Sequence, residues 1–470
     1  MAEWLCSGLQ SRVRRFDSGF SLQIMSALDT DKKLVIITTS FAPENAIGAV
    51  RLSSMAKHLS KKFSSVHVIC PNPPKSSVSD KTIDLSNINN LEVIRIKSSV
   101  IFRFIKFLRN KALLEKKASE VINLSNEKIT NLSRIKTYFM RLFFQAFTFL
   151  RNKDFLHGSL KAYKELSKEN KFNILITSYP SYSSHQAGLR IKRLNNSIKW
   201  IADFRDPMVY QSFSASKKLA SIQAEVMQKS DHVITVSNGV KEMLQISSAN
   251  KKIDVIYNGY DNLPNVDILP SIDQNDLNLC YVGTLYDGRR DLSLLFKIIN
   301  ASLTKLNRES LKFHYAGSDI NTLINQASKY HLSKNIINHG YVSRHQSIAI
   351  QKSCDFVIVG TWNSREEKGI LTGKIFEAFM LRKPIIGIVN GDLQNSEFKD
   401  LIERCNAGIA IESNFFTDNE LNKAIDLLKK VMQSKAHTSL TNPISKFTFD
   451  VEHFHYKEIF KNLSNILFSM

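Results

Sequence analysis

Short apolar runs alternate with amphipathic segments along most of this chain. The first run, at 34–39, is followed by a loop, by a segment at about 51–61 with its apolar residues on one face, and by a second run at 66–70. Runs without polar alternation are typical of strands buried on both faces of a parallel sheet. The pattern predicts an α/β doubly wound domain. Because the first loop lacks a GxGxxG motif, it does not indicate a dinucleotide site.

The same pattern starts again at residue 277, which predicts a second domain of the same class. Residues 263–275 are polar, lack periodicity and contain two prolines, as expected of a linker. Residues 1–30 show only weak periodicity and are expected to form a disordered extension. The expected organisation is an N-terminal domain over 31–262, a C-terminal domain over 276–448 and a C-terminal helix within 449–470.

Composition narrows the class of partner. The formal net charge of +21 indicates an anionic partner such as a membrane surface, a nucleic acid or a phosphorylated substrate. The five cysteines show no metal-ligand spacing and are expected to be reduced thiols of a cytosolic protein. No run approaches the roughly 20 apolar residues of a membrane-spanning helix, and the N-terminus lacks the apolar core of a secretory signal.

Segment 95–153 is strongly basic, with 14 Lys and Arg residues against three acidic ones. Phenylalanine and leucine are interleaved with these cations. Basic segments with such an apolar face commonly lie on anionic membranes, although the same pattern also fits core phenylalanines beside solvated lysines. The density of aromatic residues among cations favours the membrane interpretation. No nucleic-acid-binding motif accompanies the charge, so we expect no nucleic-acid partner.

Polar residues follow three predicted strands of the N-terminal half. They are the loop 44–51, then His185, and then Asp203, Arg205 and Asp206. Because ligands bind beyond the carboxyl ends of strands in open parallel sheets, these groups are expected to converge on one site.

The C-terminal half contains two candidate anion sites. Arg289 and Arg290 lie in the loop after the strand at 277–283, where two guanidinium groups suit a diphosphate. The Gly/Thr loop at 369–373 opens a helix whose N-terminus can bind an anion. Lys374 and Glu377 share the first exposed face of that helix and suit phosphates and a sugar diol, respectively. A capped helix with a solvated ion pair is the alternative.

Seven short motifs occur in a fixed order, and together they resemble the GT-B glycosyltransferases, in particular glycosyltransferase family 4 and its bacterial surface-polysaccharide branch. The resemblance covers about 33–468 and implies two Rossmann-like domains facing across a cleft, with the C-terminal helix packed on the N-terminal domain. The motifs are FAPEN at 41–45 with Gly48 and Arg51, 178–185, WIADFRDP at 200–207, 236–237, NGYD at 258–261, YVGTLY at 281–286 and TGKIFE at 372–377.

The resemblance implies a retaining enzyme that moves a sugar from a nucleotide-diphosphate sugar to a saccharide acceptor, without a metal or other cofactor. Glu377 would bind the ribose hydroxyls, and Arg289, with Arg290 as a second contact, would bind the diphosphate. His185, Asp203, Arg205 and Asp206 are the catalytic candidates on the acceptor side. The donor-binding candidates are Gly48, Arg51, Gly283, Thr284, Arg289, Arg290, Thr372, Gly373, Lys374 and Glu377.

Two positions depart from the family pattern. Gly369 stands where many members have a second glutamate, with Glu366 and Glu367 nearby, and Thr284 stands where many have an arginine. These departures leave the donor sugar open. The basic segment implies a lipid-linked acceptor and a cytoplasmic enzyme held at the inner face of the membrane. The alternatives are a GT-B nucleotide-sugar 2-epimerase and a non-catalytic basic scaffold that binds membrane or nucleic acid.

Overall fold

The computed structural model describes residues 31–73, 79–80, 82–105, 107, 131–210, 217–246, 250–286, 288–303, 308–436 and 443–470, with the backbone alone at 131–142 and 144. The expected extension at 1–30 lies outside the described residues, as does much of the basic segment 95–153.

The N-terminal domain is built on a parallel sheet of seven strands in the order β3-β2-β1-β4-β5-β6-β7. The order reverses between β1 and β4, so the carboxyl ends of these two strands border the crevice of a doubly wound fold. The strands are β1 (Lys33–Ile37), β2 (Ser65–Pro71), β3 (Leu91–Ile96), β4 (Ile174–Tyr179), β5 (Lys199–Phe204), β6 (His232–Thr235) and β7 (Ile253–Val255). The helices are α2 (Ile47–Leu59), α4 (Asn131–Glu169), α5 (Tyr182–Leu194), α6 (Lys217–Lys229) and α7 (Asn238–Gln245).

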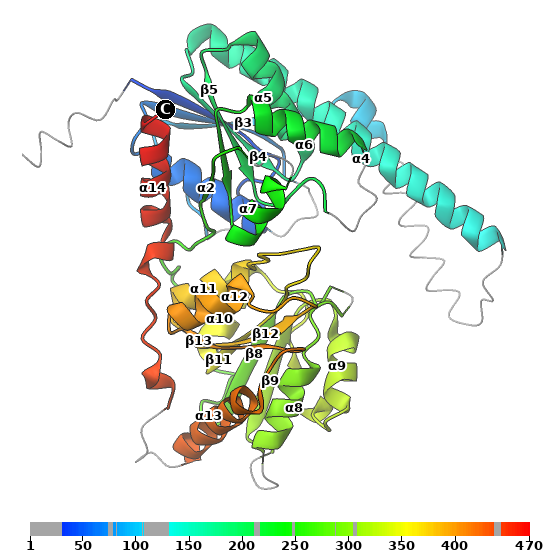
Figure 1. Ribbon diagram of the computed structural model, residues 1–470, viewed down its shortest axis with the longest axis vertical. Helices are drawn as coiled ribbons and strands as arrows, with labels where there is room; N and C mark the ends of the chain where they lie inside the picture. The colour runs from blue at the N-terminus through cyan, green and yellow to red at the C-terminus, as the bar shows by residue number, and fades with distance from the viewer. Residues whose placement is uncertain are drawn as a thin grey trace, which may run out of the picture.

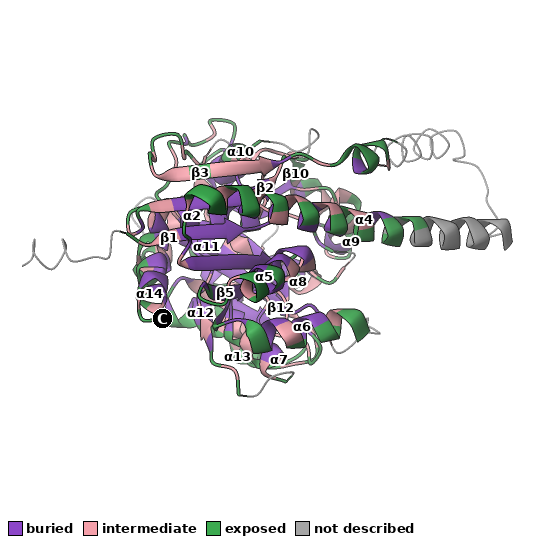
Figure 2. Ribbon diagram, turned by 90° about the horizontal axis from the view of Figure 1, so that it is seen from above, coloured by how far each residue is buried: buried purple, intermediate pink, exposed green. Residues whose placement is uncertain are grey.

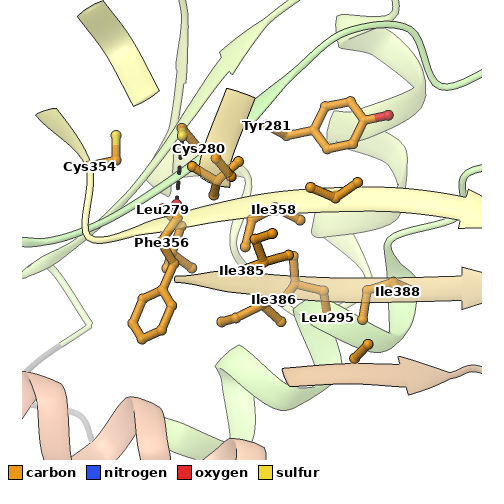
Figure 3. Packing of buried hydrophobic residues seen from close by; sticks show 14 of the residues in the cluster. Leu279, Cys280, Tyr281, Leu295, Cys354, Phe356, Ile358, Ile385, Ile386 and Ile388 are labelled. Carbon is orange, nitrogen blue, oxygen red and sulfur yellow. Dashed lines mark hydrogen bonds between the residues drawn. The ribbon is translucent and has the colours of Figure 1, made fainter. Parts of the chain in front are cut away.

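The C-terminal domain has a parallel sheet of six strands in the order β10-β9-β8-β11-β12-β13. Figure 3 shows its core, where Leu279, Phe356 and Ile386 come from three strands that neighbour one another in this sheet. The strands are β8 (Leu277–Val282), β9 (Leu311–Ala316), β10 (Ile336–Asn338), β11 (Phe356–Trp362), β12 (Ile385–Asn390) and β13 (Gly408–Glu412). The helices are α8 (Ser293–Ser302), α9 (Ile320–Ser328), α10 (Arg344–Ser353), α11 (Gly373–Leu381), α12 (Glu397–Arg404) and α13 (Asp418–Ala436).

The apolar runs of the sequence are the central strands. Residues 34–37 of β1 are fully buried, and Figure 2 shows the interior strands as buried and much of α4 as exposed. The cysteines at 70, 280, 354 and 405 are buried free thiols, as expected. Within the described part of the chain, no helix combines the length and apolar character required to cross a bilayer.

The two domains lie one above the other, and the last helix connects them (Figure 1). Helix α14 (Tyr456–Phe468) leaves the C-terminal domain and packs against the N-terminal core, where Phe468 stacks on Phe63 with ring centroids 5.2 Å apart. The expected return of the C-terminal helix is therefore confirmed. The helix begins at Tyr456, within the expected range, and a 3-10 turn at Glu452–Phe454 precedes it.

Helix α2 begins at Ile47 rather than near residue 51. Ala46 has an extended backbone and ends the preceding loop, so Gly48 and Arg51 lie inside the first turns of the helix. This earlier start brings the N-terminus of α2 to the gap between the domains, where an added methyl at Gly373 of α11 would lie 2.5 Å from Ile47.

Candidate functional site

A cavity of about 520 Å³ lies between the two domains. The N-terminal domain lines it with 45–47 and Val50 at the start of α2 and with Asp206 and Tyr210 after β5. The C-terminal domain contributes the remaining walls, which are 282–284, Tyr286, Arg290, 316–318, 341–342, Arg344, Ser347, Trp362, Glu367, 370–374 and Glu377. These residues follow the carboxyl ends of several strands, which is where a parallel α/β sheet binds ligands.

The N-terminus of α11 forms one wall. Thr372 precedes the helix with extended backbone, and its Oγ1 is buried without a hydrogen-bond partner among the described residues. Thr372 and Gly373 both line the cavity, so the positive end of the helix dipole faces it. Such a wall is suited to a negatively charged ligand.

Glu377 lies one turn further along α11. Its Oε2 accepts hydrogen bonds from Lys374 Nζ at 2.8 Å and Gln351 Nε2 at 3.0 Å, and its Oε1 accepts one from Arg344 Nε at 3.3 Å. Burial alone would raise the pKa of Glu377, but Lys374 and Arg344 outweigh burial and hold the pKa at about 2. The expected exposed face is wrong for Glu377, which is 7% exposed because α10 packs over it.

Arg344 is a residue that the sequence analysis missed. It opens α10, where a cation opposes the helix dipole. Two carboxylates compensate, because Arg344 bonds Glu377 and also reaches Asp80 of the other domain, with 3.3 Å between Nη1 and Oδ2. Burial lowers the pKa of Arg344, but these carboxylates raise it above its usual value. The GYVSRH segment at 340–345 carries no signal of this contact, since Asp80 is 264 residues away in sequence.

Arg290 lines the cavity, whereas Arg289 faces a carboxylate. The guanidinium of Arg290 lies 4.4 Å from the Tyr286 ring centroid, and its Nη1 donates to the Thr284 carbonyl at 3.0 Å. Arg289 Nη1 donates to both oxygens of Glu367 at 3.0 Å. The neighbouring arginines therefore have different partners, and Arg290 is the one at the cavity wall.

Gly283 and Thr284 form the turn after β8 at the cavity wall. Gly283 has φ of +138°, a conformation that side chains rarely adopt, and its carbonyl accepts a bond from Tyr315 Oη at 3.3 Å. The turn exposes Thr284 to the cavity in the place where an arginine is common in the family that the sequence resembles.

Glu367 was noted in the sequence only as a neighbour of the family's second glutamate position. It lines the cavity and is held by Arg289 and by Trp362 Nε1 at 2.6 Å. Gly369, which occupies that family position, instead lies against Ser237 and Gly239 of the N-terminal domain. Thus a carboxylate reaches the cavity two residues earlier in the chain than the family pattern.

Asp206 is the catalytic candidate that lines the cavity. Burial raises the pKa of Asp206 to about 6, and Arg205 beside it limits the rise. Arg205 Nε donates to the Tyr179 carbonyl at 2.9 Å, and its guanidinium lies so close to Gly48 that an added methyl there would meet Nη1 at 1.8 Å. A side chain at residue 48 would therefore displace this guanidinium from the first turn of α2.

The other N-terminal candidates lie behind the cavity wall. Arg51 is fully buried, with Nη2 3.2 Å from Asp203 Oδ1 and Nη1 donating to the Tyr257 carbonyl at 2.8 Å. Asp203 Oδ2 accepts a bond from Ser178 Oγ at 2.7 Å. The expected convergence of strand ends is present, but as a network that joins α2, β4 and β5.

His185 is also fully buried. Its Nδ1 lies 2.6 Å from Thr177 Oγ1, and its Nε2 has no hydrogen-bond partner among the described residues. Burial lowers the pKa of His185 to about 3, so the imidazole is neutral at physiological pH. In the described residues, no cluster of three or more His, Cys, Asp or Glu side chains could hold a metal ion.

Comparisons with known proteins identify the fold. No protein-family model and no curated protein matches the chain. Among solved structures, the chain is similar to sucrose-phosphate synthase from Thermosynechococcus elongatus, with 11% identity over 93% of this chain and 98% of that chain and a TM-score of 0.58. It is also similar to the lipopolysaccharide outer core galactosyltransferase WaaB, with 13% identity over 93% and 99% and a TM-score of 0.53.

A third similar structure is the E. coli trehalose-6-phosphate protein bound with UDP-2-fluoro glucose, at 11% identity over 93% of this chain and 99% of that chain, with a TM-score of 0.58. Together with the two parallel sheets and the returning α14, these likenesses confirm the expected GT-B fold. At such identities they establish the fold alone.

Proposed function

We propose that this chain is a glycosyltransferase that moves a sugar from a nucleotide-diphosphate sugar to a saccharide acceptor. The observation that carries the proposal is Glu377, which is buried and ionised at the N-terminus of α11 and faces the interdomain cavity. A carboxylate in this position can accept hydrogen bonds from a ribose diol. The likeness to WaaB and to the protein bound with UDP-2-fluoro glucose supports the same assignment.

The donor diphosphate is assigned to the C-terminal wall. Arg290, Lys374 and the positive end of α11 face the cavity and would neutralise the charge that develops on the leaving diphosphate. These groups supply positive charge without a metal ion, which is the basis for proposing metal-independent chemistry. Retention of the anomeric configuration and membership of glycosyltransferase family 4 are proposed from the sequence motifs.

The acceptor is assigned to the N-terminal wall beside Asp206. A carboxylate with a pKa of about 6 is mostly ionised at neutral pH and can accept a proton from an acceptor hydroxyl. His185, Asp203 and Arg51 lie behind this wall, so we assign them the task of fixing the strand ends that carry Asp206 and Arg205. Glu367, on the facing wall, is proposed to contact the transferred sugar.

We further propose that the acceptor is lipid-linked and that the enzyme works on surface polysaccharide at the cytoplasmic face of a membrane. The support is a described part of the basic segment. Val100, Ile101, Phe104 and Phe107 are 62–73% exposed, and the exposed Arg103 lies among them. Apolar side chains interspersed with cations suit the boundary of an anionic bilayer.

Product analysis tests the transferase function. The purified protein would be incubated with UDP-, GDP- and ADP-sugars, with and without a membrane-lipid extract from the source cells. We expect release of nucleoside diphosphate that depends on the extract, with a labelled sugar appearing in the lipid fraction. Conversion of the free nucleotide sugar to an epimer without extract would instead identify a 2-epimerase. Absence of any turnover or nucleotide binding would favour a non-catalytic scaffold.

A further inference from the structure

Arg344 is placed so that one guanidinium bonds carboxylates from both domains. Its Nε donates to Glu377 Oε1 at 3.3 Å within the C-terminal domain. Its Nη1 donates to Asp80 Oδ2 at 3.3 Å and to Thr82 Oγ1 at 2.5 Å in the N-terminal domain. The Asp80 side chain is fully buried and that of Arg344 is 14% exposed, so water does little to screen the contact.

The Asp80 segment is itself attached to the N-terminal wall of the cavity. The backbone N–H of Asp80 donates to the Pro43 carbonyl at 2.8 Å, and Ser79 forms a β-bridge with Glu44. The loop that carries these partners continues into 45–47, which line the cavity. Glu377 on the donor side is therefore connected through Arg344 and Asp80 to the loop on the acceptor side.

We propose that Arg344 is a positioning residue that couples closure of the two domains to binding at Glu377, an inference that rests on the proposed function. In this structure, which we take as the closed arrangement, the cation is divided between Asp80 and Glu377. When the domains separate, Asp80 is withdrawn, and Glu377 is the carboxylate left beside Arg344. The guanidinium, which already donates to Oε1, is then held by Glu377 alone and competes more strongly with ligand hydroxyls for that oxygen.

Coupling of this kind is reciprocal. If closure makes Glu377 a better acceptor for a ribose, then a bound nucleotide must favour closure by the same free energy. The ion pair between Arg344 and Asp80 thus serves the donor site although Asp80 lies in the other domain and does not line the cavity.

Asp80→Asn tests the coupling, because the amide keeps an oxygen for Thr82 and removes the negative charge that faces Arg344. We expect the dissociation constant for whichever of UDP, GDP or ADP binds the wild type to rise by about 5- to 50-fold. Asp84→Asn is the matched control, since Asp84 is an exposed carboxylate of the same segment that bonds Ser86. The control should bind as the wild type does.

Two further measurements separate coupling from a general loss of structure. Thr82→Val removes a neutral partner of Arg344. It should also weaken nucleotide binding, but by a smaller factor than Asp80→Asn. In a Glu377→Gln background, Asp80→Asn should change nucleotide affinity by less than about twofold, because the guanidinium of Arg344 then has no carboxylate at position 377 to bind. In the wild type, nucleotide should slow hydrogen exchange of 82–85, and it should not do so in Asp80→Asn.

The outcomes distinguish this inference from the proposed function. Failure of the wild type to bind any of the three nucleotides overturns the function and, with it, the coupling. Binding by the wild type with unchanged affinity in folded Asp80→Asn overturns the coupling alone. The coupling is also overturned if Asp80→Asn has its full effect in the Glu377→Gln background.

Discussion

At the scale of single residues, the position of a charged side chain relative to the cavity decides whether we assign it to ligand binding or to structure. Glu377 and Asp203 are both buried carboxylates that accept bonds from an arginine. Glu377 borders the cavity, so a ligand can reach its oxygens, whereas Asp203 lies behind the wall and is bonded by Arg51 and Ser178. The first is therefore assigned to binding and the second to holding the strand ends.

The ionisation of Glu377 makes stability depend on acidity. Folding lowers the pKa of Glu377 from 4.5 to about 2. The contribution of Glu377 to the free energy of unfolding is therefore present above pH 4.5 and is lost as the pH falls towards 2. The contribution is on the order of 3 kcal/mol. In urea unfolding at pH 6, 4 and 3, we expect Glu377→Gln to lose less stability on acidification than the wild type. Parallel losses in the two proteins would contradict the assignment.

Arg51 provides the contrasting prediction. Arg51→Met leaves Asp203 buried without its cation, which is expected to cost about 3–5 kcal/mol of unfolding free energy. Because Arg51 does not line the cavity, the folded variant should retain nucleotide affinity within about twofold. Denaturant titration would measure the unfolding free energy and calorimetry the nucleotide affinity, both at 15 °C. A stable variant that fails to bind would instead place Arg51 in contact with the ligand.

These residues also show what a sequence can predict. Spacing alone identified Lys374 and Glu377 as a pair, because i and i+3 positions are neighbours on any helix. It could not reveal that α10 covers Glu377, nor that Arg344 reaches Asp80, since those contacts depend on how distant elements pack. The sequence put Arg289 before Arg290 as the diphosphate ligand, whereas the turn after β8 places Arg290 at the cavity and Arg289 beside Glu367.

At the scale of elements, the described start of the basic segment packs against helix α4. Phe102 is buried against Phe147 of α4, with ring centroids 5.2 Å apart, while its neighbours Ile101 and Phe104 face solvent. The Ser99 N–H also donates to Asp154 of α4 at 3.1 Å. The residues around Phe102 are therefore fixed beside α4, with their apolar neighbours exposed.

Replacing Ile101, Phe104 and Phe107 with serine should weaken membrane binding while leaving the fold intact, because all three are exposed. In co-sedimentation with vesicles containing anionic lipid, we expect the triple variant to bind with at least about tenfold lower affinity than the wild type. Ser98→Ala, at an adjacent position, serves as the control. Equal binding by the triple variant and the wild type would show that these side chains do not enter the membrane.

At the scale of the whole molecule, the domains meet away from the cavity through a second set of contacts. Glu397 at the start of α12 accepts bonds from the N–H groups of Asn238 at 2.8 Å and Gly239 at 3.0 Å, which open α7. Gly239 also lies against Gly369, where an added methyl would meet the Gly369 nitrogen at 2.3 Å. The two glycines permit this close approach of the domains.

Gly239→Ala should therefore separate the domains without harming α7, since alanine is the better helix former. Small-angle scattering should show a larger radius of gyration, and nucleotide affinity should fall by about tenfold, because the cavity has walls from both domains. Lys241→Ala in the same helix is the control. An unchanged radius of gyration would mean that the interface adapts to the methyl group.

The order of elements was largely predictable because each apolar run is a strand whose partners follow the doubly wound rule. The relative placement of the domains was not, because it depends on single close contacts such as Gly239 with Gly369 and on the length of the chain that brings α14 back. These contacts leave no periodic signal in the sequence.

The central claim is that the interdomain cavity binds a nucleoside diphosphate through Glu377. Isothermal titration with UDP, GDP and ADP of the wild type and of Glu377→Ala tests it most directly. We expect one of the three to bind the wild type in the micromolar range and to bind folded Glu377→Ala at least about tenfold more weakly. Absence of binding by the wild type, or equal binding by the variant, would contradict the claim.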